Sequence, residues 1–443
     1  MVPAGLSRLL YSLYVLGPGS NRALREYAWI RWYESASEDA RKAARDELFR
    51  RLVQFAYDEV PFYHRLYDAH AVDLKGINGV EDIAKLPPVS REMLAAAPLS
   101  EIRPRQTRKL VFKSYTSGSS GRPLAFYRSL SSILYTGGRL LHYLESWGRP
   151  EARKVFFILH AFDPTLSVNL YHGHRFSFLN RRHSISPFLP ADRIIERMQS
   201  GRPEVVVAFP SALLDLALRY RERGRRYEKS VILVTSGEMM TENMLDRIAD
   251  AFPGFQWFDL YAAAETGFIA AHCACSDLLH INEDSIIVEE GESAGGYTTP
   301  VITNLRNRGT PFIRYTGVTD LLRLAEAETC GCGGSGRLIK SIAGRAADRI
   351  AVSRTKAIPA AELMTVHARI PGIQRLYYAQ PEPGTLILRY VPRSGSNPDE
   401  VAAEAEELIR GVVGQELRFS VEAVERLRRS RTSSKVPLLV RES

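Results

Sequence analysis

The segment Thr116-Ser117-Gly118-Ser119-Ser120-Gly121-Arg122-Pro123 places several hydroxyl side chains and two glycines in one short stretch. Glycine lets the backbone turn tightly and approach a ligand, and successive backbone N–H groups in such a turn form a nest for an anion. The segment therefore predicts a phosphate-binding loop, although a flexible surface loop can have the same composition. It differs from the common nucleotide loop, which has four residues between its glycines and then Lys followed by Ser or Thr.

Composition and charge narrow the class of protein that carries this loop. The chain has 443 residues, of which 45% are hydrophobic and 25% charged, as in an ordinary globular protein. Its length favours more than one domain, since single cores stop growing at roughly 250–300 residues. The net charge is +9, but the basic residues are dispersed, which argues against nucleic-acid binding. The apolar run 9–16 is too short to span a bilayer and lacks signal-peptide features, so we expect a cytoplasmic protein without membrane contact.

Beyond the loop, short aliphatic runs alternate with helical patterns. The strand-like runs are 155–159, 204–208 and 230–234. Helical spacing is found at 21–57, 128–147, 192–200 and 211–223. Alternation of this kind predicts an α/β fold in which helices flank a mostly parallel sheet.

A change in character near residue 344 divides the chain into two expected domains. From about 256 to 343 short predicted strands dominate and complete an N-terminal domain of residues 1–343. Residues 344–443 are expected to form a smaller α+β domain. Its helix at 398–413 is well marked, with Asn397 as N-cap and proline at the first position.

Four cysteines are present, in the pairs Cys273/Cys275 and Cys330/Cys332. Without an export signal a disulfide framework is not expected, and two close pairs far apart in the sequence are more typical of a metal site. Four thiolates match a closed tetrahedral zinc site with a structural role. His272 and His280 are alternative ligands, and four unrelated thiols remain the alternative to a metal site.

Further motifs follow the loop in a fixed order. They are Ser236-Gly237-Glu238, Asp259-Leu260-Tyr261-Ala262-Ala263-Ala264-Glu265-Thr266, Ile313-Arg314-Tyr315-Thr316-Gly317-Val318-Thr319-Asp320, Gly344-Arg345-Ala346-Ala347-Asp348-Arg349-Ile350, and Lys435 within Arg431-Thr432-Ser433-Ser434-Lys435-Val436. In this order and at these spacings the chain resembles the adenylate-forming superfamily. It looks most like the phenylacetate–CoA ligase branch, which includes the CapK-like proteins. The resemblance extends from about residue 50 to the end of the chain.

For the phosphate side of the site, the resemblance implies that the loop holds the β- and γ-phosphates of ATP. The residues concerned are Thr116, Ser117, Gly118, Ser119, Ser120 and Gly121. Glu265 would hold Mg²⁺, a hard cation that takes carboxylate and phosphate oxygens. Lys435 would bridge the substrate carboxylate and the α-phosphate and stabilise the charge that develops in the transition state. Thr116, Glu265 and Lys435 are therefore the expected catalytic residues.

For the nucleoside side, the resemblance implies a pocket for adenine and ribose. Gly237 and Glu238 would line the adenine pocket, and Tyr261 would pack against the base. Asp320 would accept both ribose hydroxyls, with Arg345 nearby.

The sequence departs from the family pattern at two points, and it matches the family hinge at a third. Ala264 stands where the family usually has Thr or Ser before the magnesium-binding Glu, which removes a hydroxyl from the α-phosphate. Val318 and Thr319 separate the glycine of the ribose motif from its aspartate. Asp348 matches the hinge about which the small C-terminal domain of the family rotates between two half-reactions.

The substrate is inferred from the segments that form the acid pocket in this family. They contain His160, Phe162, Phe209, Ala262 and Ala263, an apolar and aromatic mixture that favours a hydrophobic or aryl carboxylic acid. CoA is the expected acceptor of the acyl group, and an amine or a carrier-protein thiol are alternatives. A degenerate protein that binds nucleotide or acid without turnover is a further alternative, supported only by Ala264. The branch often forms dimers, so a homodimer is left open.

Overall fold

The structure is a computed structural model that describes residues 22–442 with several gaps. The gaps are 106–110, 117–122, 151, 153, 160–180, 295, 326–329, 335, 347, 354–355, 364–369, 371, 394, 415, 426 and 428–437. In the described part, eleven strands form one large mixed sheet, and three smaller sheets accompany it. Within these described ranges, no helix combines the length and the apolar character that crossing a membrane requires.

One half of the large sheet is parallel and confirms the predicted α/β class. Its neighbouring strands, in spatial order, are β4 (Arg181–Ser184), β3 (Lys154–Ile158), β5 (Val205–Ala208), β6 (Ile232–Thr235) and β7 (Gln256–Ala263). The helices that follow these strands are α8 (Ala191–Gly201), α9 (Pro210–Glu222) and α10 (Glu242–Ala251). Every residue of β5 and β6 is buried, as expected for strands of a parallel sheet covered by helices.

The other half of the sheet is antiparallel and begins where β7 changes partner. Strand β7 pairs parallel with β6 through its first half and antiparallel with β8 through its second half. The remaining strands are β8 (Gly267–Cys273), β9 (Ser276–Ile281), β13 (Leu338–Arg345), β12 (Asp320–Leu324), β11 (Tyr297–Asn304) and β10 (Ile286–Ala294). Because the turn between β7 and β8 lies at this change, it places Glu265 at the junction of the two halves.

The N-terminal region is helical, but its first long helical pattern is divided in two. Helix α2 (Arg22–Ser35) ends before Ser37, whose hydroxyl accepts a hydrogen bond from Ala40 N and begins α3 (Glu38–Glu59). The single helix expected at 21–57 is therefore two helices, because Ser37 acts as an N-cap within that stretch. The elements that follow are α4 (Pro61–Ala69), η1 (Leu74–Gly76), η2 (Val80–Lys85) and α5 (Arg91–Ala96).

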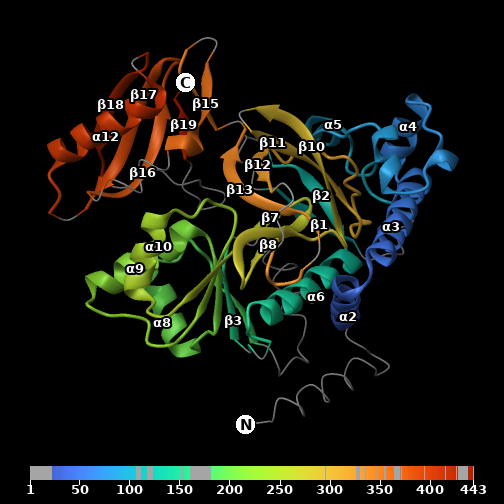
Figure 1. Ribbon diagram of the computed structural model, residues 1–443, viewed down its shortest axis with the longest axis horizontal. Helices are drawn as coiled ribbons and strands as arrows, with labels where there is room; N and C mark the ends of the chain where they lie inside the picture. Colours follow the sequence, from blue (N-terminus) through green and yellow to red (C-terminus); the bar gives the residue numbers. More distant parts are fainter. Residues whose placement is uncertain are drawn as a thin grey trace, which may run out of the picture.

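A hairpin and a helix carry the hydroxyl-rich segment. Strands β1 (Val111–Tyr115) and β2 (Ala125–Ser129) pair antiparallel, and α6 (Leu130–Ser146) follows directly. Figure 1 shows α6 crossing beside α2 and beneath the large sheet. Of the hydroxyl-rich segment, Ser117, Gly118, Ser119, Ser120 and Gly121 lie outside the described residues, and Thr116 directly follows β1.

The C-terminal region has a sheet and an apolar core of its own. The sheet has the order β18 (Arg418–Ala423), β17 (Thr385–Pro392), β16 (Ile373–Gln380) and β19 (Leu439–Arg441), with α12 (Pro398–Val413) against it. A short hairpin, β14 (Arg349–Ala351) and β15 (Ala357–Pro359), followed by η3 (Ala360–Leu363), links this region to β13. In Figure 1 the C-terminal sheet stands above the layer of α9 and α10. Arg247 of α10 donates to the carbonyls of Ile373 and Gln374, and Arg375 pairs with Asp215 of α9, so both helices contact this sheet.

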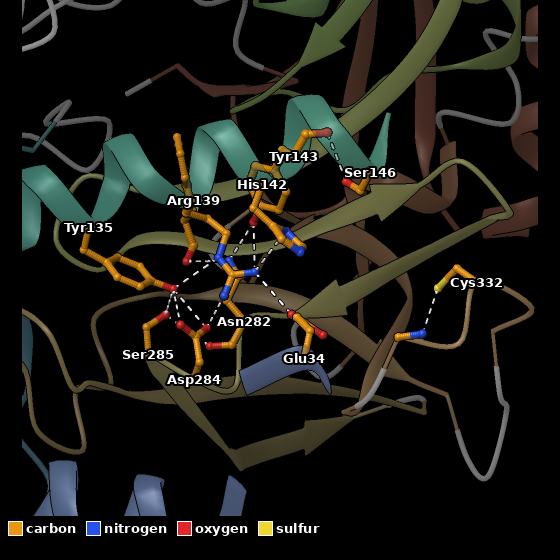
Figure 2. A network of polar contacts seen from close by, with 12 residues as sticks. Glu34, Tyr135, Arg139, His142, Tyr143, Ser146, Asn282, Asp284, Ser285 and Cys332 are labelled. Atoms are coloured by element: carbon orange, nitrogen blue, oxygen red, sulfur yellow. Dashed lines mark hydrogen bonds and ion pairs between the residues drawn. The ribbon is translucent and has the colours of Figure 1, made fainter. Parts of the chain in front are cut away.

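A buried ion pair joins α6 to the turn between β9 and β10 (Figure 2). Arg139 and Asp284 form a salt bridge with side chains 2% and 1% exposed. The Tyr135 hydroxyl donates to Asp284 at 2.8 Å and also lies 2.8 Å from Ser285 Oγ. Glu34 of α2 lies 3.4 Å from Arg139. The network therefore ties α2 and α6 to the β-rich half of the protein.

Candidate active site

The turn after β7 directs the Glu265 carboxylate into the interior. Its side chain is 9% exposed, and burial raises the pKa of Glu265 above its usual value. Two groups reach the same oxygen, Oε1: the Tyr315 hydroxyl donates at 3.4 Å, and Arg91 Nη1 lies at 3.4 Å. A buried carboxylate of this kind is chemically suited to a divalent ion of small radius.

Arg91 connects Glu265 to the base of the hydroxyl-rich loop. Its Nη2 donates to Thr116 Oγ1 at 3.0 Å, and the same oxygen accepts a bond from Leu124 N at 2.9 Å. Thr116 N in turn donates to Leu124 O at 2.9 Å, which closes the loop at its two ends. The structure thus brings together Thr116 and Glu265, which are 149 positions apart in the chain.

Sequence reasoning missed Arg91 and Tyr315 for different reasons. Arg91 lies in the proline-rich segment 84–112, which shows little more than loop character, although Ser90 before it is a good N-cap. Tyr315 lies inside one of the motifs, but the motif does not indicate what its hydroxyl contacts. Nothing in a single sequence indicates that these side chains meet at Glu265, because the contact depends on the pairing of distant segments.

The backbone around Tyr315 is held in an unusual conformation. Arg314 has φ of 50°, in the left-handed region that residues with a side chain seldom adopt. Val89 N donates to Arg314 O at 2.9 Å, and the Arg314 side chain pairs with Glu289 at 2.9 Å. Tyr315 is then fixed by reciprocal backbone bonds with Ile302 at 2.9 Å. Such local strain persists where the surroundings enforce it, and it often marks functional sites.

A second group of polar residues lies on the neighbouring strands. The Tyr261 hydroxyl donates to Asp320 Oδ2 at 2.9 Å, and Arg345 Nε lies 4.0 Å from Asp320 Oδ1. Asp320 and Arg345 face each other in the β12–β13 pairing. Burial, and after it the negative charge of Asp320, raises the pKa of Tyr261 well above its usual value. This phenol therefore stays protonated and donates its hydrogen bond. The two inserted residues before Asp320 do not prevent its carboxylate from reaching Tyr261.

Gly237 and Glu238 follow β6 at the carboxyl edge of the parallel strands. Gly237 has φ of 78°, which requires glycine for an unstrained turn. The Glu238 carboxylate accepts from Ser211 N at 2.9 Å and from Ser211 Oγ at 3.1 Å. Ser211 stands in the first turn of α9, where a carboxylate is favoured by the helix dipole. The observed contacts of Glu238 therefore link the β6 edge to α9.

The structure describes only some of the other predicted site residues. Phe209 is buried at the start of α9, and Ala262 and Ala263 lie partly buried at the end of β7. His160, Phe162 and Lys435 lie outside the described residues. Asp348 stands between β13 and β14, where its backbone N–H donates to Arg345 O and its carbonyl accepts from Ala360 N. Burial raises the pKa of the Asp348 carboxyl.

A separate cluster brings together three of the cysteines with a histidine. Ligand atoms of Cys273, His280, Cys330 and Cys332 all lie within 4.8 Å of one another. Cys273 Sγ lies 3.3 Å from Cys330 Sγ, and Cys332 Sγ lies 3.4 Å from His280 Nε2. The expected fourth ligand, Cys275, is not in this group: it is exposed, and its backbone N–H donates to Cys273 Sγ at 3.3 Å. His280, which was an alternative ligand in the sequence, takes that place because β9 pairs with β8 and β13.

The chemistry around these thiols suits a metal ion. Hydrogen bonds, first among them that from Ser276, outweigh burial and lower the pKa of the Cys330 thiol to about 6, whereas burial raises the pKa of the Cys332 thiol to about 12. Gly334 N donates to Cys332 Sγ at 3.2 Å, and a Cβ at Gly334 would lie 3.1 Å from both Cys332 Sγ and His280 Cε1. Glycine therefore leaves room for the two side chains to converge.

Comparison with known proteins places these features in a family context. No family model matches the chain. The phenylacetate-coenzyme A ligase of Thermus thermophilus is 26% identical over 364 residues, which cover 77% of this chain and 79% of that enzyme.

Solved structures share the fold over most of the chain. A 2-hydroxyisobutyryl-CoA ligase in its postadenylation state superposes with a TM-score of 0.78 at 20% identity, covering 93% of this chain and 91% of that chain. The amide bond synthetase McbA of Marinactinospora thermotolerans gives 0.52 at 16% identity, covering 83% and 76%. The curated relative, the ordered motifs and this common fold agree in their resemblance to the adenylate-forming superfamily, and within it to the phenylacetate–CoA ligase-like branch.

Proposed function

We propose that this protein is an ATP-dependent ligase that adenylates a hydrophobic or aryl carboxylic acid and transfers the acyl group to CoA. The observation that carries the proposal is that two polar groups lie close together near the junction of the two halves of the large sheet, since Tyr261 lies on β7, which leads into the turn that carries Glu265. Thr116 and Glu265, joined through Arg91, provide a place for phosphates and magnesium. Tyr261, Asp320 and Arg345 supply hydrogen-bonding groups for a ribose.

Each residue of the site has a defined part in this proposal. Thr116 would anchor the loop that cradles the β- and γ-phosphates, and Asp320 would accept hydrogen bonds from the ribose hydroxyls. Magnesium, held by Glu265, would supply positive charge beside the phosphate oxygens. Lys435 would donate to the substrate carboxylate and the α-phosphate and stabilise the developing charge. Ala264 contributes no hydroxyl, so the α-phosphate depends more strongly on Lys435.

The two half-reactions call for two positions of the C-terminal region, with residues 1–343 and 344–443 as the moving units and Asp348 at the hinge. The TM-score is 0.78 with the postadenylation state of the 2-hydroxyisobutyryl-CoA ligase and 0.62 with its thioesterification state, which supports an adenylation-side pose for the present arrangement. Rotation about a few backbone torsions at the hinge would exchange the poses.

The function is tested by following pyrophosphate release from ATP and Mg²⁺ with a panel of aryl and alkyl acids, with and without hydroxylamine. Acid-dependent release with hydroxamate formation is expected for an adenylating ligase, and CoA, amines and a carrier-protein thiol are then compared as acceptors. ATP binding without release for any acid would instead favour a degenerate binding protein. Ala264→Thr would then be the first variant to test for restored turnover.

We also propose that Cys273, His280, Cys330 and Cys332 hold a structural zinc ion, a kind of site that the resemblance to the CapK-like proteins also favours. Three sulfurs and one imidazole form a closed tetrahedral set without an open position for chemistry. The ion would tie the β8–β9 hairpin to the segment between β12 and β13. Since β8 follows Glu265 and β12 begins at Asp320, the ion would stabilise the strands that carry both sides of the site.

Cys330→Ser is expected to lose the metal, whereas Cys275→Ser is expected to keep it. Metal analysis of the purified proteins should give about one zinc per chain for the wild type and Cys275→Ser, and little for Cys330→Ser. Chelation should lower the midpoint temperature of unfolding of the wild type and of Cys275→Ser, because metal binding contributes to the folding free energy. Equal zinc in all three proteins, or zinc in none, would contradict this ligand set.

A further inference from the structure

Arg91 lies between Thr116 and Glu265, the two residues on either side of the phosphates in the proposed site. It lies at the first position of α5, after the N-cap Ser90, and its side chain is 19% exposed. One guanidinium nitrogen reaches Thr116 Oγ1 at 3.0 Å and the other reaches Glu265 Oε1 at 3.4 Å. The fork of one side chain therefore contacts the base of the loop and the magnesium-binding carboxylate at once.

We propose that Arg91 binds the β- or γ-phosphate of the nucleotide, an inference that rests on the adenylating function proposed above. In the present structure Arg91 lies beside Glu265 Oε1, at the long distance of 3.4 Å. A divalent ion on that carboxylate would repel a guanidinium so close to it. Phosphate oxygens arriving with the ion offer the same guanidinium a better acceptor, in the planar geometry that arginine prefers.

The charge of the site supports this role. Glu265 and Asp320 are both acidic, and ATP brings further negative charge that magnesium neutralises only in part. Arg345 lies beside Asp320 on the ribose side, 4.0 Å away. Arg91 lies on the opposite side, beside Thr116, where the β- and γ-phosphates are expected. The two arginines would thus serve different parts of the same nucleotide.

The experiment is equilibrium binding of ATP and of AMP, measured by calorimetry in Mg²⁺ and in EDTA. The variants are Arg91→Gln, Arg91→Lys and the matched control Arg65→Gln, which removes an exposed arginine of α4 that pairs with Glu101. AMP contains the adenine, the ribose and the α-phosphate but lacks the two phosphates that Arg91 would contact. Binding is the readout, so turnover is not required.

Arg91→Gln is expected to weaken ATP binding by roughly tenfold or more, in the range of a charged hydrogen bond, while AMP binding changes little. Arg91→Lys should recover part of the loss, and Arg65→Gln should match the wild type. Equal weakening of ATP and AMP would mean that Arg91 only supports the fold of the site and would overturn the inference, as would unchanged ATP binding. Failure of the wild-type protein to bind ATP or AMP would instead overturn the adenylating function itself.

Discussion

Asp284→Asn is expected to lower the free energy of unfolding by about 3–5 kcal/mol, because it removes the more deeply buried of the two carboxylates that face the buried Arg139 guanidinium. Burial alone would lower the pKa of Arg139, but Asp284 raises it well above the usual value, so arginine remains charged in the interior. The substitution keeps the size of the side chain and removes only the charge. Tyr135 and Ser285 would remain as uncharged hydrogen-bonding neighbours, and Glu34, 30% exposed and 3.4 Å from Arg139, would remain as the more solvated counter-charge.

Denaturant unfolding of the wild type and the variant measures this loss. Asp192→Asn is the matched control, since it makes the same chemical change in an ion pair with Arg219 whose side chains are 33% and 39% exposed. The denaturant midpoint of Asp192→Asn should stay close to that of the wild type. A variant of Asp284 as stable as the Asp192 control would show that the buried pair contributes far less than its burial indicates.

Much of the parallel half of the fold could be predicted from local sequence. Strands β5 and β6 consist of consecutive buried aliphatic residues, and α12 carries its own start signals in Asn397 and Pro398. These features are local, so they can be read without knowledge of the tertiary structure. The break at Ser37 was missed because the apolar spacing on either side of it looks continuous.

The contacts within the site could be predicted only in part, for a physical reason. The resemblance implies that Tyr261 packs against adenine and that Asp320 binds the ribose, and in the structure the Tyr261 hydroxyl donates to Asp320 at 2.9 Å. Strand pairing, by contrast, decides which residues complete each cluster. His280, and not Cys275, lies with Cys273, Cys330 and Cys332 through the register of β9, and Arg91 reaches Glu265 from a segment 174 residues earlier. A single sequence does not specify such pairings.

Lys435→Ala is expected to reduce adenylation by roughly 10²–10³-fold, since it removes the cation that would stabilise charge in the transition state. Transfer of the acyl group from a supplied acyl-adenylate to CoA should remain close to that of the wild type. Pyrophosphate release measures the first step, and thioester formation from synthetic acyl-adenylate measures the second. Lys85→Ala, an exposed lysine paired with Asp82 on η2, is the matched control and should affect neither step.

The selective loss is expected because Lys435 stands four residues before β19 in the sequence, and β19 belongs to the C-terminal sheet. Strand β19 pairs with β16 through Tyr378 and Leu439, so a rotation of this sheet would move β19 and the chain connected to it. The contacts of Arg247 with Ile373 and Gln374 hold the sheet in the present pose. Arg247→Ala should therefore slow adenylation more mildly than Lys435→Ala and leave transfer intact, because it loosens the pose and keeps the cation. Equal loss of both steps in Lys435→Ala would contradict two poses and place the lysine at a single site that serves both reactions.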